Sequence, residues 1–274
     1  MKTKSGIMRL LIKASAFITF AALFFIIAYI IINGMPNLKP SLFALEYTTT
    51  NVSMFPSIIN TILLVLLTLI IATPIGVFTG FYLVEYAKRG NKLVEVIRIT
   101  TETLSGIPSI VYGLFGMLFF VYRLEFSYSL LAGTLTAAIM VLPVIIRSTE
   151  EALMAVDDSL REASFGLGAG KLRTIFRVVL PVAMPGILSG IILSIGRIVG
   201  ETAALMYTLG TATKMINGFF SSGRTLSLHM YVLSSEGLFV KEAYATGVIL
   251  LLIVLLINGL STYLSNKLTK GRLD

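Results

Sequence analysis

Residues 162–181 read Glu-Ala-Ser-Phe-Gly-Leu-Gly-Ala-Gly-Lys-Leu-Arg-Thr-Ile-Phe-Arg-Val-Val-Leu-Pro. This stretch is the longest polar, charge-bearing interval between two hydrophobic segments of the chain. We expect a helix to begin near Asp157 or Ser159, because Asp and Ser side chains accept backbone hydrogen bonds at helix N-termini. Arg161 and Glu162 then fall in its first turns. The interval therefore predicts a short helix outside the hydrophobic segments.

Three glycines at alternate positions follow this helix. Gly166, Gly168 and Gly170 would end it and let the backbone turn, since glycine adopts conformations that other residues avoid. A second helical stretch is expected after the turn and would run to the boundary formed by two prolines. It carries the basic residues Lys171, Arg173 and Arg177 and ends at Pro181 and Pro185.

The composition excludes several classes of protein. Of the 274 residues, 56% are hydrophobic and 13% are charged, which is typical of a membrane protein. The sequence has no cysteine, which excludes a disulfide framework, a thiolate metal site and a thiol nucleophile, and its single histidine, His229, argues against a histidine metal centre. The net charge of +8 does not indicate nucleic-acid binding, because the basic residues cluster beside apolar segments.

No nucleotide or other cofactor site is expected in this chain. Gly170-Lys171 has a faint similarity to a phosphate-binding loop, but Leu172 stands where such a loop has Ser or Thr, and Phe165 stands where it has its first Gly.

Six apolar stretches are long enough to cross a hydrocarbon core, which takes about 20 helical residues. They lie near 14–33, 57–84, 103–122, 128–146, 183–209 and 243–265. No small-residue cleavage pattern follows the first, so we expect an uncleaved signal anchor rather than a signal peptide.

The distribution of Lys and Arg predicts the orientation of these spans. With the N-terminus inside, sixteen of the 22 basic residues fall in inside segments, five fall in outside segments and Arg197 alone lies within a span. The inside residues include Lys88, Arg89 and Arg272. Both termini and the 162–181 loop are therefore expected on the cytoplasmic side of the plasma (inner) membrane.

The second and third spans contain residues that bend helices or allow close packing. Pro74 predicts a kink in the second span, and Pro108 predicts a bend or a helix start in the third. Gly113 and Gly116 permit a neighbouring helix to approach closely.

The fifth span carries the charged residues of most interest. On a helix, Ser194, Arg197 and Glu201 fall on the half that also holds the small residues, so they are expected to face the bundle interior or a water-filled cavity. Arg197 lies near mid-span, and Glu201 follows one turn later at a spacing that allows an ion pair.

Two interpretations of this pair stay open. In the first, Arg197 and Glu201 neutralise each other and hold helices together. In the second, the planar guanidinium of Arg197 attracts an anion that crosses the membrane, and Glu201 keeps it oriented between transport events.

The 225–231 stretch predicts a short helix in the outer loop, folded against the mouth of the pore. We expect His229 to be packed or at the surface rather than a ligand. Asn258, in the sixth span, is as well suited to join helices as to contact a substrate.

The 162–181 stretch resembles the cytoplasmic loop of ABC-importer permeases, which reads Glu-Ala-Ala, three residues, Gly, nine residues, Ile-x-Leu-Pro. Glu162, Ala163, Gly168, Leu180 and Pro181 match without a gap, while Ser164 and Val178 depart mildly. The resemblance implies that this loop docks on an ATPase subunit, with Glu162, Ala163, Gly168, Ala169 and Lys171 as coupling residues.

Three further stretches, within a resemblance that covers about 55–265, are similar to the phosphate-importer branch of these permeases. They are Tyr-Leu-Val-Glu-Tyr-Ala at 82–87, Gly-Ile-Pro-Ser-Ile-Val-Tyr-Gly-Leu-Phe-Gly at 106–116, and Gly-Arg-Ile-Val-Gly-Glu-Thr at 196–202; Ala204 departs from the usual Pro. The resemblance implies a substrate pathway that includes Ser194, Arg197, Glu201 and Thr202.

The resemblance implies an all-α, polytopic membrane protein with six transmembrane helices and the type I (MetI-like) ABC-importer permease fold. Its parts would be a cytoplasmic N-terminus (1–13), a six-span domain (14–265; core about 55–265, coupling loop 148–181) and a cytoplasmic C-terminus (266–274). The chain itself would not be an enzyme.

The function implied is a permease subunit of a phosphate importer of the PstA type. Its partners would be a homologous permease subunit in a heterodimer, two ATPase subunits that hold ATP and Mg, an extracytoplasmic phosphate-binding protein, inorganic phosphate and the lipid bilayer. The alternatives are a permease for another oxyanion, the sister phosphate permease, and an ion-coupled secondary transporter, which would need no docking loop.

Overall fold

The computed structural model describes residues 2–87 and 90–270, with side chains for residues 8–87 and 90–263. Three basic residues that the orientation argument used lie outside the described residues: Lys88, Arg89 and Arg272. The last four residues of the predicted C-terminus, 271–274, also lie outside them. Within them, every regular element is helical, which confirms the predicted all-α class. The helices are α1 (Lys2–Gly34), α2 (Phe55–Phe81), α3 (Lys92–Ser105), α4 (Ser109–Gly116), α5 (Leu130–Met154), α6 (Asp158–Gly166), α7 (Lys171–Thr174), α8 (Leu180–Gly200), α9 (Ala203–Met206), α10 (Leu226–Ser235) and α11 (Val240–Lys270).

Five short elements complete the fold. Two are 3-10 helices, η1 (Met35–Asn37) and η2 (Pro40–Phe43), and three are π-helical turns, η3 (Tyr82–Tyr86), η4 (Met117–Arg123) and η5 (Ile175–Val179). The π turns continue α2, α4 and α7 respectively, so they lengthen these helices rather than divide them.

Five described helices are long and apolar enough to cross a membrane, and a bent pair makes a sixth candidate. The predicted spans at 14–33, 57–84, 128–146 and 243–265 correspond to α1, α2 with η3, α5 and α11. The helix α2 runs through Pro74 undivided, and α5 extends beyond the predicted 146 to Met154.

The predicted third span, 103–122, does not form a single helix, and the bend or helix start predicted at Pro108 is confirmed. The chain instead forms α3 and then α4 with η4, and these two pieces meet at an angle of 105°. The break falls at Gly106-Ile107-Pro108, where Pro108 has an extended backbone and starts α4. A proline has no N–H to donate and disfavours the helical conformation of the residue before it, so the helix bends here.

The fifth span also differs from its predicted bounds, 183–209. The loop's second helix does not end at the Pro181–Pro185 boundary but continues as one 30-residue helix from Lys171 to Gly200, which we call the rod. Pro181 lies just after the π-helical turn η5, inside the rod, and Pro185 lies within α8. The rod then ends at Gly200, because Glu201 adopts an extended backbone conformation.

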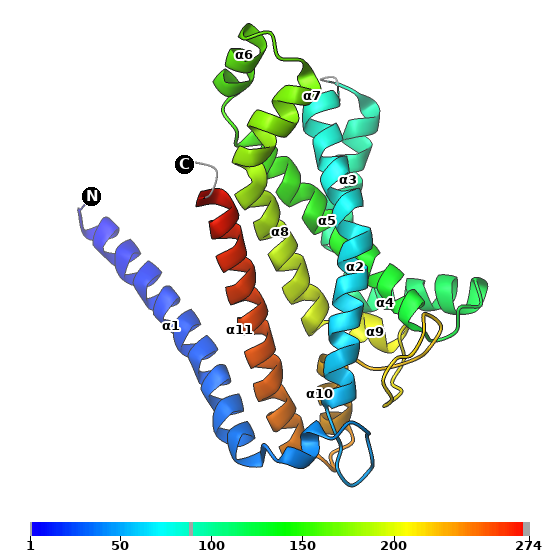
Figure 1. Ribbon diagram of the computed structural model, residues 1–274. Coiled ribbons are helices and arrows are strands. Elements are labelled where there is room, and N and C mark those ends of the chain that lie inside the picture. Colours follow the sequence, from blue (N-terminus) through cyan, green and yellow to red (C-terminus); the bar gives the residue numbers. More distant parts are fainter. Residues whose placement is uncertain (1, 88–89, 271–274) are drawn as a thin grey trace.

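The core lies where α2, α5 and α8 pack together, with the bent α3–α4 pair beside them (Figure 1). Its buried side chains come from all three helices and include Leu64, Met140, Val141, Ile145 and Ile198. This arrangement fixes the rod against α5 along most of its length.

The bundle has two distinct ends (Figure 1). The loop end carries α6, α7 and η3, and the start of α1 and the end of α11 also lie toward it. The cap end is formed by α10 and the α1–α2 connection, which share a second apolar cluster of residues such as Leu42, Met54 and Leu226. The helix α1 meets α11 near the cap end and diverges from it toward its own N-terminus.

Candidate functional site

The loop at 157–181 begins as its sequence predicts. The Asp157 side chain accepts a hydrogen bond from the Ser159 backbone N–H over 2.8 Å and caps α6. Hydrogen bonds from Ser159 hold the pKa of Asp157 below its ordinary value, because they stabilise the charged carboxylate. Both the start of α6 and its end at Gly166 confirm the expected helix.

The turn between α6 and α7 depends on Gly168. This residue has a φ of +79°, in the left-handed region that favours glycine. The turn is closed by a 2.8 Å hydrogen bond between the hydroxyls of Ser164 and Thr174, which are both buried. The Ala169 N–H also donates to the Ser164 carbonyl. These contacts join α6 to the first turn of the rod.

The outer surface of the loop is exposed and partly apolar. Of the predicted coupling residues, Glu162, Ala163, Gly168 and Lys171 are exposed and Ala169 is half-buried. Leu167, at the tip, is 89% exposed, and Phe165 beside it is 47% exposed. Exposed apolar side chains rimmed by charge are typical of an interaction surface.

Lys171 also has a partner within the chain. Its ammonium lies 4.6 Å from the centre of the Tyr86 ring, close enough for a cation–π interaction. This contact links the start of the rod to η3, at the end of α2.

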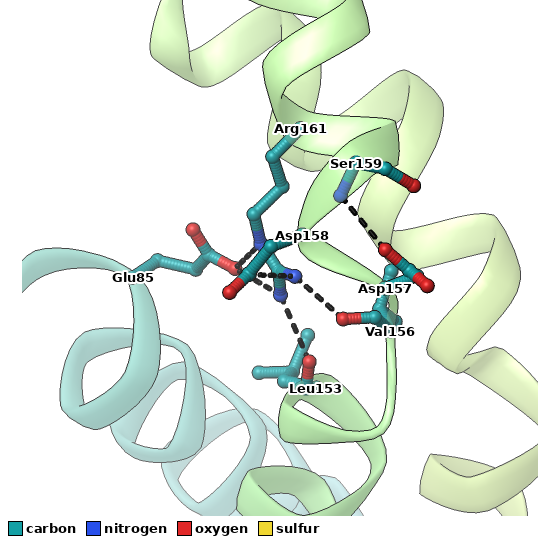
Figure 2. A network of polar contacts seen from close by, with 7 residues as sticks. All are labelled: Glu85, Leu153, Val156, Asp157, Asp158, Ser159 and Arg161. Atoms are coloured by element: carbon teal, nitrogen blue, oxygen red, sulfur yellow. Dashed lines mark hydrogen bonds and ion pairs between the residues drawn. The ribbon is translucent and has the colours of Figure 1, made fainter.

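Sequence reasoning missed the role of Arg161, which lies in α6 and whose side chain is only 13% exposed. Its guanidinium bonds to Glu85 of η3 and to two backbone carbonyls at the end of α5 (Figure 2). Arg161 and Glu85 are 76 positions apart in the sequence. No local pattern signals such a pair, although Glu85 does lie in one of the family-like stretches.

Arg197 is partly exposed and lines an open groove of about 640 Å³ between α5, α8 and α11. Asn258 and Thr262 of α11 also line this groove. Ser189, which lies eight residues before Arg197 on α8, lines it as well. In the described part of the chain, Arg197 takes part in none of the ion pairs. The groove thus combines one guanidinium with neutral hydrogen-bonding groups.

The predicted ion pair between Arg197 and Glu201 is wrong. The prediction assumed a continuous helix, but the rod ends between the two residues. The Glu201 Oε1 atom instead accepts hydrogen bonds from the N–H groups of Thr202, at 3.2 Å, and Ala204, at 2.9 Å. Glu201 is 8% exposed. It therefore caps α9 rather than balancing the charge of Arg197.

The remaining two pathway candidates lie apart from Arg197. Ser194 is fully buried, and its hydroxyl donates to the Gly190 carbonyl. Thr202 lines a different, mostly apolar cavity of about 640 Å³ between α1, α9, α10 and α11. The structure does not bring the four predicted residues into one site.

The helix α9, which follows the break after α8, packs directly on α4. A Cβ atom on Gly113 would lie 2.8 Å from the Cα of Ala204, so only glycine allows this approach. The Tyr112 hydroxyl donates to the Leu104 carbonyl over 2.7 Å and ties α4 back to α3. The stretch 106–116 therefore packs on α9, which directly follows the stretch 196–202.

His229 lies in the predicted short helix, which is α10, and is fully buried. Its ring meets that of Tyr47 edge to face at 6.2 Å. Burial and the charge of the nearby Arg224 lower the pKa of His229 to about 3. The expectation of a packed histidine is confirmed.

In the described residues, no cluster of three or more His, Cys, Asp or Glu residues could hold a metal ion.

The comparisons with known proteins agree with this architecture. The family described as "Binding-protein-dependent transport system inner membrane component" matches residues 72–270. The "Probable ABC transporter permease protein YqgI" of Bacillus subtilis is 34% identical over 266 residues, which is 89% of this chain and 88% of the relative.

Two further similarities concern the phosphate-importer branch of the permeases and the fold. The "Phosphate transport system permease protein PstA 1" of Mycobacterium tuberculosis is 42% identical over 163 residues, which is 59% of this chain and 53% of that protein. A permease chain of the MetNI methionine ABC transporter superposes with a TM-score of 0.60 at 20% identity, over 79% of this chain and 94% of that chain. The last similarity confirms the predicted MetI-like fold.

Proposed function

We propose that this chain, which belongs to the family of binding-protein-dependent transport system inner membrane components, is a permease subunit of an ATP-driven phosphate importer. It is a multi-pass membrane protein. In this proposal the chain forms half of the pathway for phosphate, and ATP is hydrolysed on separate ATPase subunits.

One observation carries the proposal: the rod joins the exposed loop to the groove that holds Arg197. Lys171 stands at the beginning of this unbroken helix, and Arg197 lies on the same helix, roughly 40 Å further along at about 1.5 Å per residue. A displacement of the loop would therefore move the guanidinium. Such a connection suits a transporter in which ATP binding outside the membrane alters a substrate site within it.

The docking surface is the exposed side of α6 and of the turn after it. Leu167 and Phe165 present apolar area, and Glu162 presents charge beside them. We infer that this surface lies in the cytoplasm and inserts into a groove on an ATPase subunit that holds ATP and Mg. Most Lys and Arg residues lie in segments on the same side of the predicted spans as this loop, and this bias supports that orientation.

The second half of the pathway would come from a homologous permease. Along α8, residues at intervals of three, four or seven remain exposed: Val182, Gly186, Ser189, Leu193 and Gly200. Small residues let a second helix approach closely. An extracytoplasmic binding protein would deliver phosphate at the cap end.

Phosphate is the proposed substrate for two reasons. The guanidinium of Arg197 is planar and can donate two parallel hydrogen bonds to an oxyanion. The chain is also 42% identical, over 163 residues, to a protein whose name says that it serves phosphate transport. Asn258 and Thr262, as neutral donors in the same groove, would complete the contacts to the anion.

The function is tested by transport in proteoliposomes that contain this chain with its second permease and ATPase. Uptake of labelled phosphate should require both ATP and the binding protein, and unlabelled sulfate or molybdate should compete poorly. Preferential uptake of one of those anions would assign the permease to another oxyanion. Uptake driven by an ion gradient without ATP would instead indicate a secondary transporter.

A further inference from the structure

We propose that Arg161 and Glu85 form a coupling clamp, which makes the docking helix α6 move together with the end of α2. This inference rests on the proposed function, because it concerns how movement of the docked loop reaches the membrane helices. Arg161 and Glu85 are positioning residues in this proposal, and neither contacts the substrate.

The guanidinium of Arg161 uses all of its hydrogen-bonding capacity within the chain. Its Nε and Nη2 atoms donate to Glu85 Oε1 at 3.1 and 3.0 Å. Its Nη1 atom donates to the Val156 carbonyl at 2.7 Å and to Asp158 Oδ1 at 3.0 Å, and Nη2 donates to the Leu153 carbonyl at 2.8 Å. Five N–H donors are all that arginine has. Lysine, with three donors on one nitrogen, could not reproduce this set.

These five bonds join three separate parts of the fold (Figure 2). Glu85 belongs to η3 at the end of α2, Leu153 and Val156 lie at and just beyond the end of α5, and Asp158 belongs to α6 itself. The last carbonyls of a helix have no partner within that helix. Arg161 bonds to one such carbonyl, that of Leu153, and to the Val156 carbonyl just beyond α5, and it therefore fixes the start of α6 to both α5 and α2.

The clamp is shielded from water. The side chains of Arg161 and Glu85 are only 13% and 9% exposed, so solvent and salt screen their attraction less than they screen an exposed pair. The ion pair that Arg98 makes with Glu150 differs, since the Arg98 side chain is 50% exposed. Arg98 and Arg161 line the same groove of about 840 Å³, which makes the Arg98 pair a matched control.

The inner side of α6 thus has two attachments at neighbouring turns. Ser164 bonds to Thr174 at the start of the rod, and Arg161, three residues earlier, bonds to Glu85. One attachment leads to the helix that carries Arg197, and the other leads to α2, which packs mainly against α5 in the core. A load applied to the exposed side of α6 would therefore reach two membrane helices at once. Without the clamp, the bonded attachment of α6 to the end of α2 would be lost, whereas the attachment to the rod would remain.

The experiment compares Glu85→Gln, Arg161→Gln and Arg161→Lys with the control Arg98→Gln, each in the complete complex with its ATPase, second permease and binding protein. Three quantities are measured: co-purification of the ATPase, the rate of ATP hydrolysis, and the amount of inorganic phosphate transported per ATP hydrolysed. The clamp variants should keep the ATPase bound and active but transport about tenfold less phosphate per ATP, within the usual range of coupling between sites. The control should retain the parent ratio.

Two comparisons identify which idea fails. Combining Glu85→Gln with Arg161→Gln should lower the ratio no further than Arg161→Gln alone, because Glu85 acts through Arg161. An unchanged ratio in Glu85→Gln, which leaves the carbonyl contacts of Arg161 in place and is the variant least prone to misfold, would overturn the clamp while the parent complex still transports phosphate. Absence of ATP-driven phosphate uptake by the parent complex would instead overturn the proposed function.

Discussion

The carboxylate of Glu201 accepts a hydrogen bond from the backbone N–H of Ala204 over 2.9 Å. This contact holds the break between α8 and α9 and leaves Arg197 without a carboxylate partner from its own helix. A guanidinium that is not neutralised internally remains available to an anion. The same break places α9 against α4, where Ala204 meets Gly113.

The first prediction concerns this cap. Glu201→Gln should preserve it, because an amide oxygen can still accept the N–H groups of Thr202 and Ala204. Glu201→Ala removes the acceptor and should lower the stability of the subunit by about 1 kcal/mol, as loss of a capping side chain usually does. Thermal unfolding of the purified complex measures the difference. Equal loss in both variants would show that the negative charge matters rather than the cap.

The second prediction concerns the turn of the docking loop. Gly168→Ala places a side chain on a residue with φ +79°, which costs about 1 kcal/mol or more, and should weaken binding of the ATPase. Gly170→Ala is the matched control, since its φ of −73° is ordinary and a Cβ there has nothing within 4 Å. Co-purification of the ATPase is the measurement. Equal yields from the two variants would contradict the proposed importance of this turn.

Much of the loop could be predicted because its signals are local. Asp157 accepts a hydrogen bond from a residue two positions away, and the conformation of Gly168 depends on its own backbone. The start of α10 at Leu226 follows from the same kind of signal, since Thr225 accepts a hydrogen bond from the N–H of Leu228. Capping and turn chemistry act over three or four residues, so they can be read from sequence.

The bends in the membrane helices could be predicted only in part. Pro108 indicated a bend, but the pattern of apolar residues continues on both sides of it, and a change of 105° in direction leaves that pattern unaltered. Pro181 and Pro185 were expected to end a helix, yet the rod continues through both. The difference lies in the backbone around each proline, which sequence pattern does not specify.

The relationship between Arg197 and Glu201 could not be predicted, because the spacing argument holds only on an unbroken helix. Nothing in the residues 196–202 shows that Glu201 would leave the helix. The clamp between Arg161 and Glu85 was missed for another reason: the two residues are 76 positions apart, and only the packing of α6 against the end of α2 brings them together.

The third prediction concerns pH and His229. Its pKa falls from an ordinary 6.5 to about 3 in the folded chain because of burial and the nearby Arg224. Between these values the unfolded chain binds more protons than the folded one, so stability should fall as the pH drops from 6.5 toward 3, by at most about 1.4 kcal/mol per pH unit. His229→Gln cannot titrate and should show a smaller loss of thermal stability between pH 7 and pH 5. An identical loss would place the acid sensitivity elsewhere.

The fourth prediction concerns orientation. Because the chain contains no cysteine, single cysteines can report the side of the membrane on which they lie. Ser159, in α6, and Ala212, in the segment after α9, are both exposed, and along the chain they lie on either side of α8. In intact cells a membrane-impermeant thiol reagent should label Ala212→Cys, whereas Ser159→Cys should react only after the membrane is opened. The reverse labelling would exclude docking of the loop on a cytoplasmic ATPase.

The central claim, that phosphate passes the guanidinium of Arg197, is tested most directly by the initial rate of ATP-driven phosphate uptake in Arg197→Gln. We expect a complex that assembles and hydrolyses ATP but takes up phosphate at least about tenfold more slowly, since loss of one charged hydrogen-bond donor costs about 1.5–3 kcal/mol. Arg197→Lys should retain an intermediate rate, because its charge remains but its paired donors are lost. Uptake by Arg197→Gln at the parent rate would contradict the claim.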